Sequence, residues 1–185
     1  MDLHSQARLS DAGELQTSRL RLAPLTAQHA AEFAAWSGVA DVSRMTGSVL
    51  PGWSAEEAAA WIEQRRWQGV PGFVLGIWRK DRPELIGQIG MSKAPTDIGY
   101  MIAPAHAGQG YAFEAAQALL AGAFCKFDLD EVVASSFQDN PASMRILDKL
   151  GFERFEEKQV QAPTRVEPAM INKYRLTNPD RKRVR

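Results

Sequence analysis

The chain has 185 residues, 45% of them hydrophobic, with 22 basic residues against 22 acidic ones. This length is enough for one well-packed domain and short for two. The zero net charge removes the usual electrostatic argument for nucleic-acid binding, so we expect a small-molecule or peptide partner and no nucleic acid.

The sequence gives no support for secretion, membrane insertion or disulfide bonding. It has no N-terminal apolar segment of the signal-peptide kind and no run of about 18 apolar residues. Its single cysteine, Cys125, excludes an internal disulfide and a multi-cysteine metal site. We therefore expect a soluble cytoplasmic protein in which Cys125, on an apolar segment, fills the core.

Both ends of the chain are expected to be flexible. Residues 1–14 are polar and lack periodicity, and residues 179–185 end in a basic run. These two segments bound a single predicted domain over 15–178. Its first element is a half-buried strand over 17–23, where leucine alternates with arginine.

Two helices are predicted next. Residues 26–36 begin with a threonine that can cap a helix, and Ser54 with Glu57 forms a capping box for a helix that runs to about residue 67. The segment between them, 37–53, contains glycines and a proline, which favours a mobile connection.

The stretch from 97 to 113 organises the rest of the chain. A buried strand over 97–102 is followed by Pro104, which cannot donate to a sheet, and then by Gly108 and Gly110. An apolar helix begins at Tyr111. Since the first N–H groups of a helix lack intrahelical partners and the helix dipole is positive there, this stretch predicts a phosphate cradle.

Strands and one more helix complete the predicted domain. The helix is opened by Asn140 and Pro141 and closed by Gly151, which is the usual asymmetry of helix ends. A hairpin is expected over 73–78 and 84–91, and the later strands over 131–136, 152–161 and 169–176.

Two common phosphate loops do not fit the glycine stretch. A Walker loop needs Lys-Ser or Lys-Thr after its last glycine, but Tyr111 and Ala112 follow Gly110. A dinucleotide fingerprint needs Gly or Ala where Phe113 stands, within a parallel βαβ repeat that these hairpin-connected strands do not supply.

The wider context resembles the GCN5-related N-acetyltransferases. Three segments carry the resemblance, in order along 15–176: TSRLRLAPLTAQHA, IGYMIAPAHAGQGYAFEA and DNPASMRILDKLGFE. The chain looks most like the branch that acetylates the N-termini of ribosomal proteins. The resemblance implies the acyltransferase fold of that family, an α/β domain with a mixed, mostly antiparallel central sheet flanked by helices.

The resemblance also implies where acetyl-CoA binds. The family loop, written Gln or Arg, x, x, Gly, x, Gly or Ala, falls on Ala107, Gly108, Gln109, Gly110, Tyr111 and Ala112. Alanine at the first position should weaken the site modestly, because backbone N–H groups do most of the pyrophosphate binding. The pantetheine arm is expected between the strand 97–102 and the next, with a backbone N–H near Ile102 polarising the thioester. Asn140 matches a residue that contacts the arm, although an ordinary helix cap explains it equally.

Two catalytic residues are implied in the same way. Ser143 matches a serine near the leaving sulfur, where it could relay a proton, although a solvent-facing serine of a first helical turn also explains it. Asp97 is the candidate general base, with a simple strand-start residue as the alternative. Tyr100 is most simply explained by strand packing, and His106 by solvation beside the loop.

We therefore expect an enzyme that transfers acetyl from acetyl-CoA to a primary amine by direct attack in a ternary complex. A protein N-terminal α-amine is the favoured acceptor, because its pKa of about 7.7–8.0 leaves about a tenth of it neutral at pH 7. The alternatives are a small-molecule amine and a non-catalytic acyl-CoA-binding module of the same fold. No metal is implied, and a monomer or homodimer is expected.

Overall fold

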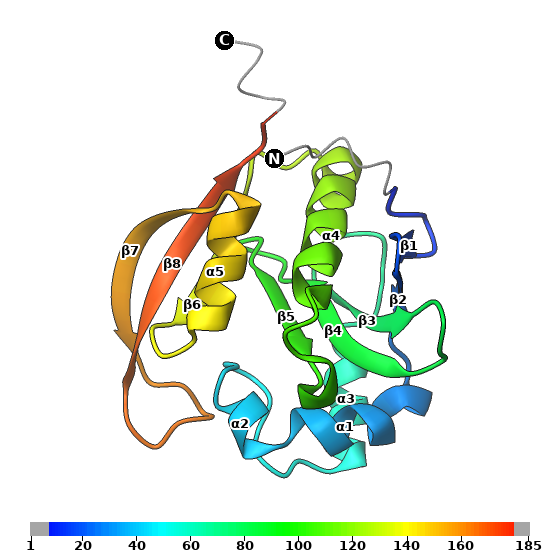
Figure 1. Ribbon diagram of the computed structural model, residues 1–185, viewed down its shortest axis with the longest axis horizontal. Coiled ribbons are helices and arrows are strands. Elements are labelled where there is room, and N and C mark those ends of the chain that lie inside the picture. Colours follow the sequence, from blue (N-terminus) through cyan, green and yellow to red (C-terminus); the bar gives the residue numbers. More distant parts are fainter. Residues whose placement is uncertain (1–7, 180–185) are drawn as a thin grey trace.

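Eight strands form two antiparallel sheets in the computed structural model, which describes residues 8–179 (Figure 1). The first sheet has the order β1 (Leu15–Gln16), β2 (Leu20–Pro24), β3 (Phe73–Arg79), β4 (Leu85–Met91) and β5 (Ile98–Ile102). The second has the order β6 (Glu131–Phe137), β8 (Ala169–Thr177) and β7 (Glu153–Val160).

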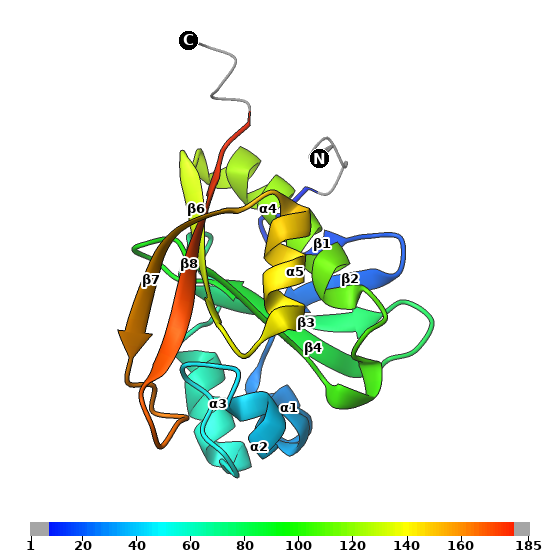
Figure 2. The same cartoon turned by 60° about the vertical axis from the view of Figure 1, so that its left-hand side comes forward.

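Helices cover both faces of this arrangement. They are the 3₁₀ turns η1 (Ala27–His29) and η2 (Pro104–His106) and the α-helices α1 (Ala30–Ser37), α2 (Ala40–Ser43), α3 (Ala55–Glu63), α4 (Tyr111–Phe127) and α5 (Pro141–Leu150). Helices α4 and α5 pack side by side, whereas α1, α2 and α3 gather at one end of the molecule (Figures 1 and 2). No helix within residues 8–179 combines the length and apolarity of a membrane span.

The two sheets meet at a single parallel bridge. Asp97 pairs with Val133, and the Val133 amide donates to the carbonyl of Thr96 at 2.9 Å. Beyond this point β5 and β6 belong to different sheets, and we call the divergence between these two strands the gap. The predicted fold class, a mixed, mostly antiparallel sheet flanked by helices, is confirmed. The parallel pairing in it is the bridge between Asp97 and Val133.

The central strands are buried on both faces because a layer of helices covers each side. Along β3, Leu75 and Ile77 pack into the core beneath α4, whereas Val74 and Trp78 pack with Phe33 of α1 on the opposite face. Side chains alternate between the two faces of a strand, so each face contributes to a different apolar cluster. The packed sheet therefore fixes the positions at which the adjoining helices begin.

Local end signals in the sequence are confirmed. Ser54 accepts a hydrogen bond from the Glu57 amide at 3.2 Å, and Glu57 accepts from the Ser54 amide at 2.7 Å, which is the predicted capping box. Asn140 caps α5, and Gly151 ends it in the left-handed region at φ +84°. Helix α3 ends at Glu63, earlier than expected. The next amides make tighter bonds to the residue three positions back, Arg65 to Ile62 and Arg66 to Glu63, and the Val74 amide of β3 donates to the carbonyl of Arg65 at 2.8 Å.

Three expectations from the sequence are corrected. Segment 37–53 contains α2 and the fully buried Val49 and packs on the domain, so the predicted mobile connection is wrong. In the expected lead-in, Leu9 is only 6% exposed and lies in the core, although residues 1–7 are outside the described range. Cys125 is exposed, because the buried residues of α4 lie on the faces beside it. The predicted basic tail beyond residue 179 also lies outside the described residues.

Candidate functional site

The glycine loop and the start of α4 form an open set of backbone donors. Gly108 and Gly110 have φ values of +75° and +80°, a region that side chains with a Cβ rarely adopt. Space around Gly108 is open, since an added Cβ would meet nothing within 4 Å. The first amide of α4 that bonds back is Glu114, to Gly110 at 3.1 Å. The preceding amides therefore point outward at the positive end of a 17-residue helix, which suits a pyrophosphate.

A basic residue that the sequence did not single out braces this loop. Arg19 lies 90 positions before Gln109, yet its Nη1 donates to the Gln109 carbonyl at 3.1 Å. Its Nε pairs with Glu114 at 2.6 Å, and its guanidinium lies 4.6 Å from the Tyr111 ring centroid. Arg19 thus places a positive charge beside the loop in which Ala107 replaces the family's basic or amide residue.

The carboxylate of Glu114, in the first turn of α4, is hydrogen-bonded and ion-paired. Burial would raise its pKa, but hydrogen bonds from Thr17, Arg19 and Ser18 outweigh burial and lower it. The Arg19 amide donates to Oε1 at 3.0 Å, and the Ser18 hydroxyl does so at 3.1 Å. The turn between β1 and β2 therefore keeps Glu114 ionised and pairs its charge with that of Arg19, which reduces its repulsion of a phosphate.

Hydrogen-bond alternation along β5 leaves every second backbone position facing the gap. The Ala103 amide donates to the carbonyl of Ile86, and the Ser92 amide donates to the carbonyl of Asp97, both at 2.9 Å. Residues at odd positions of β5 therefore exchange hydrogen bonds with β4. In an antiparallel ladder, the residues between such pairs direct their N–H and C=O groups away from the partner strand.

The outward positions are Ile98, Tyr100 and Ile102. The carbonyl of Thr96, which accepts from Val133 of β6, follows the same alternation. Past the bridge between Asp97 and Val133, this edge of β5 has no partner strand within residues 8–179, and an extended chain of matching polarity can line it. The N–H of Ile102 lies on this edge, in the orientation needed to donate to a ligand carbonyl.

Helix α5 brings Asn140 and Ser143 to the other side of the gap. Asn140 Oδ1 accepts the Ser143 amide at 3.1 Å, which makes it the N-cap, and among the described residues its Nδ2 has no partner. The Ser143 hydroxyl lies 3.1 Å from the hydroxyl of Tyr100 on β5. Ser143 is thus half-buried and hydrogen-bonded across the gap, and Tyr100 does more than pack.

Burial raises the pKa of both ionisable groups on β5. The pKa of Asp97 rises to about 6 because the carboxyl group is desolvated, and a long hydrogen bond from Ser135 at 3.5 Å and the charge of Lys173 offset this only in part. Burial likewise raises the pKa of Tyr100 to about 12, although its bond with Ser143 opposes the shift. At neutral pH, Asp97 can accept a proton and Tyr100 retains its own.

His106 is not solvated, contrary to expectation. Its side chain is 11% exposed, and Nε2 lies 3.1 Å from Glu84 at the start of β4. This contact fixes η2, which leads from β5 into the glycine loop. Within residues 8–179 no group of three His, Cys, Asp or Glu side chains could hold a metal ion.

Comparison with known proteins identifies a family and a fold. Residues 19–153 match the family model described as an acetyltransferase (GNAT) domain. An uncharacterised N-acetyltransferase of Bacillus subtilis, YoaA, is 34% identical over 147 residues, which cover 76% of this chain and 82% of the relative.

Two solved structures have the same fold at low sequence identity. A GNAT-family acetyltransferase of Bacillus anthracis superposes with a TM-score of 0.77 at 20% identity, over 89% of this chain and 98% of its own. RimL, an α-N-acetyltransferase of ribosomal protein L7/L12 solved with coenzyme A, gives a TM-score of 0.73 at 16% identity, over 87% and 95% of the two chains.

Proposed function

This chain belongs to the GNAT acetyltransferase family and is an N-acetyltransferase that uses acetyl-CoA as co-substrate. From that premise we propose that it acetylates protein N-terminal α-amines. The choice rests on the acceptor, because an α-amine needs less from any base than a lysine amine does. The proposed base is the buried Asp97 carboxyl, which lies 3.5 Å from the Ser135 hydroxyl and whose pKa burial raises to about 6. The pKa of Asp97 is about two units below that of a protein α-amine, which is near 8, and more than four units below that of a lysine amine. Proton removal from an N-terminus is therefore far less uphill.

The cofactor is proposed to bind along the elements just described. Within the loop 107–112, the amides from Gly108 to Ala112 hold the pyrophosphate and Arg19 braces the loop, whereas the Ala107 amide donates to the carbonyl of Pro104 at 3.2 Å. The free edge of β5 and Nδ2 of Asn140 line the pantetheine arm. Two observations support this placement of the cofactor: the space around Gly108 is open, and every second residue of β5 directs its backbone N–H and C=O groups away from β4.

Each catalytic residue has one task in the proposed reaction. Asp97 takes a proton from the acceptor ammonium through a chain of waters, because it lies five residues, about 16 Å, from Ile102 along the extended strand. The neutral nitrogen then forms the new C–N bond at the thioester carbon. The Ile102 amide donates to the oxygen on which negative charge develops, an interaction worth roughly 3 kcal/mol. The C–S bond then breaks, and the second proton of the nitrogen passes through the hydroxyl of Ser143, which is hydrogen-bonded to Tyr100, to the leaving sulfur, so that the serine hydroxyl is restored. A thiol pKa near about 8.5 means that this help is modest.

The proposed acceptor is tested by acetyl transfer to matched amines. Peptides with a free N-terminus and no lysine are compared with N-formylated peptides that contain one lysine, and with small-molecule amines. Transfer is measured by thiol release and confirmed by mass spectrometry. We expect acetylation of free N-termini with the lysine peptides at least about 100-fold slower.

Two results bear on different parts of the proposal. Preferred acetylation of lysine or of a small amine would overturn the acceptor and leave the family assignment intact. Gly110→Glu, which puts bulk and negative charge at the helix start, should abolish acetyl-CoA binding without loss of the circular dichroism signal. Retained binding would overturn the assignment of 107–112 as the pyrophosphate loop.

A further inference from the structure

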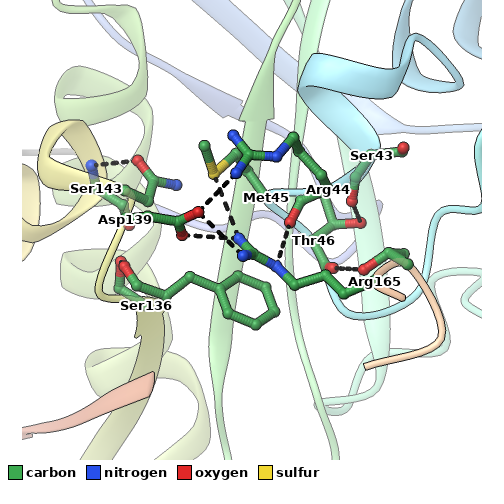
Figure 3. Close-up of polar contacts among 11 residues, drawn as sticks. Ser43, Arg44, Met45, Thr46, Ser136, Asp139, Ser143 and Arg165 are labelled. Carbon is green, nitrogen blue, oxygen red and sulfur yellow. Dashed lines mark hydrogen bonds and ion pairs between the residues drawn. The ribbon is translucent and has the colours of Figure 1, made fainter. Parts of the chain in front are cut away.

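Three segments far apart in sequence meet at Asp139, in the turn between β6 and α5 (Figure 3). Arg165, from the connection between β7 and β8, pairs with both carboxylate oxygens, at 3.0 Å through Nη1 and 2.7 Å through Nη2. Arg44, which follows α2, adds Nη2 at 2.7 Å. We call Arg44, Asp139 and Arg165 the Asp139 clamp.

Arg165 is the rigid part of the clamp. Its side chain is 13% exposed, and its guanidinium lies 3.9 Å from the centroid of the Phe137 ring. Its Nε also donates to the carbonyl of Arg44 at 3.0 Å. A planar guanidinium can satisfy a bidentate carboxylate, a carbonyl and an aromatic face together, which a lysine ammonium cannot.

A neighbouring bond ties the same two outer segments together. The Thr164 hydroxyl donates to the carbonyl of Thr46 at 2.6 Å. Segments 43–46 and 164–165 are therefore joined to each other as well as to Asp139. The hydrogen bonds and charge of Arg165 and the charge of Arg44 lower the pKa of Asp139, so the clamp stays ionised well below neutral pH.

Asp139 of the clamp is adjacent in sequence to Asn140, which faces the gap. Asp139 precedes Asn140, whose side chain caps α5 through the Ser143 amide. Fixing Asp139 therefore fixes where α5 begins, and with it the direction of the Ser143 hydroxyl towards Tyr100. Small displacements of such groups reduce rates strongly, since about 1 Å can cost about 100-fold.

We propose that Arg44, Asp139 and Arg165 are positioning residues for acetyl transfer. They fasten the α2 region and the β7–β8 connection to the turn that carries Asn140, so that the walls on that side of the gap and the start of α5 form one unit. The catalytic part of this role rests on the proposed function of Asn140 and Ser143. The structural part, the joining of three segments, does not.

The first measurement needs no acceptor. Hydrogen exchange is compared between wild type, Asp139→Asn and the control Glu157→Gln, which breaks an exposed pair with Arg154 on β7. Asp139→Asn should speed exchange together in 39–50, 137–143 and 161–168, and the control in none of them. Faster exchange confined to 137–143 would overturn the proposed joining.

The second measurement separates kcat from KM with the amine that the enzyme acetylates. Asp139→Asn and Arg165→Lys should lower kcat about 10- to 100-fold and change the acetyl-CoA Kd less than about fivefold, because the glycine loop is untouched. Arg44→Lys should stay within about threefold of wild type, since Arg44 uses a single nitrogen on Asp139. Equal losses in Arg44→Lys and Arg165→Lys, or an unchanged kcat, would overturn the positioning role.

Folding is checked for each variant by thermal melting. If Asp139→Asn does not fold, Arg44→Met replaces it, because that side chain is 45% exposed and its loss leaves the bidentate pair in place. Arg44→Met should speed exchange in 39–50 and lower kcat by less than Arg165→Lys does. If no acceptor is found, the exchange data still decide whether the three segments are joined.

Discussion

Asp97 occupies a position where ionisation is costly, and this gives stability and activity opposite pH dependences. Its folded pKa of about 6 lies above the ordinary value of 3.8, because burial disfavours the charged form. The resulting stability is fully present below pH 4 and is lost as pH rises through 6. The proposed base function needs the ionised form and so grows over the same interval.

Asp97→Asn should therefore stabilise the protein above pH 6 and impair transfer. We expect about 1–2 kcal/mol of added stability at pH 8, or a few degrees in Tm, and almost none at pH 4. The value of kcat/KM should fall about 100-fold or more. Thermal melts at the two pH values and initial rates check this. A variant that is fully active, or destabilised at pH 8, would contradict the role given to Asp97.

Ser143 and Tyr100 are expected to act as one hydroxyl pair. Ser143→Ala and Tyr100→Phe should each lower kcat about tenfold, and the double variant should be no worse than either. Because the pKa of Tyr100 is about 12, the wild-type rate should show no loss from Tyr100 ionisation below about pH 10. Rate profiles from pH 6 to 10 measure both effects. Multiplicative losses would show that the two hydroxyls act separately.

Arg19→Met should weaken the hold on the phosphates. The change frees the Gln109 carbonyl and leaves Glu114 as a less compensated negative charge at the start of α4. The acetyl-CoA Kd should rise about 5- to 10-fold, whereas the KM for acetyl-pantetheine, which has no phosphates, should not change. Calorimetry and rates measure the two. Arg21→Met, two residues further along the chain but paired with Glu14, is the matched control.

Residue types were more predictable at this scale than their partners. Asn140, Ser143 and the glycines were proposed as site residues from the motifs that carry the resemblance, and in the structure Asn140 Oδ1 accepts the Ser143 amide at 3.1 Å. Arg19 was missed because an arginine in an alternating strand is typical of an exposed face, and its partners lie 90 and 95 positions away. No local pattern encodes such a contact.

At the scale of elements, helix ends dominate what is predictable. Gly151 lies at φ +84°, and an added Cβ would meet only Leu176 at 3.9 Å, so substitution there costs backbone strain and little else. Gly151→Ala should destabilise the protein by about 1 kcal/mol. Gly47→Ala, with open space and no left-handed φ, should be neutral. Urea melts of the two variants test this, and equal destabilisation would point to packing instead.

The elements that were misjudged depend on contacts outside their own segment. The two residues of β1 form a strand only because β2 pairs with them. Segment 37–53 has loop composition, yet Val49 is buried among residues of α1 and α3. Caps are decided within about four residues and can be found in the sequence, whereas tertiary burial cannot.

At the scale of the whole molecule, the divided sheet predicts how acetyl-CoA changes the protein. Ligand at about 100 times its Kd should add about 2.7 kcal/mol of stability. Acetyl-CoA should also slow hydrogen exchange across Ile98–Ile102, whereas adenosine 3′,5′-bisphosphate should stabilise without protecting those amides. Exchange measured with each ligand decides the matter. Equal protection by both would contradict the placement of the arm against β5.

The topology could be predicted because the order of the sequence motifs matches that of a known family, and no estimate of folding energy was needed. Hairpins, the β5–α4 unit and the α5 signature occur in the order expected for the family, and the family model spans 19–153. A ligand arm between β5 and the next strand was expected only from the resemblance, and the bridge between Asp97 and Val133 was not anticipated, since a single bridge leaves no pattern in the sequence. The Asp139 clamp was not anticipated at all, because it joins residues 95 and 26 positions apart.

The exposed thiol of Cys125 makes this chain convenient for spectroscopy. Because it is the one cysteine in the sequence and lies on the outer face of α4, a maleimide dye can be attached at a single known place. It lies 14 positions after Tyr111, roughly 21 Å along the helix from the glycine loop. A fluorophore there can report ligand binding at the far end of the same helix without obstructing it, and labelling also removes the one protein thiol that would add background to a coenzyme A release assay.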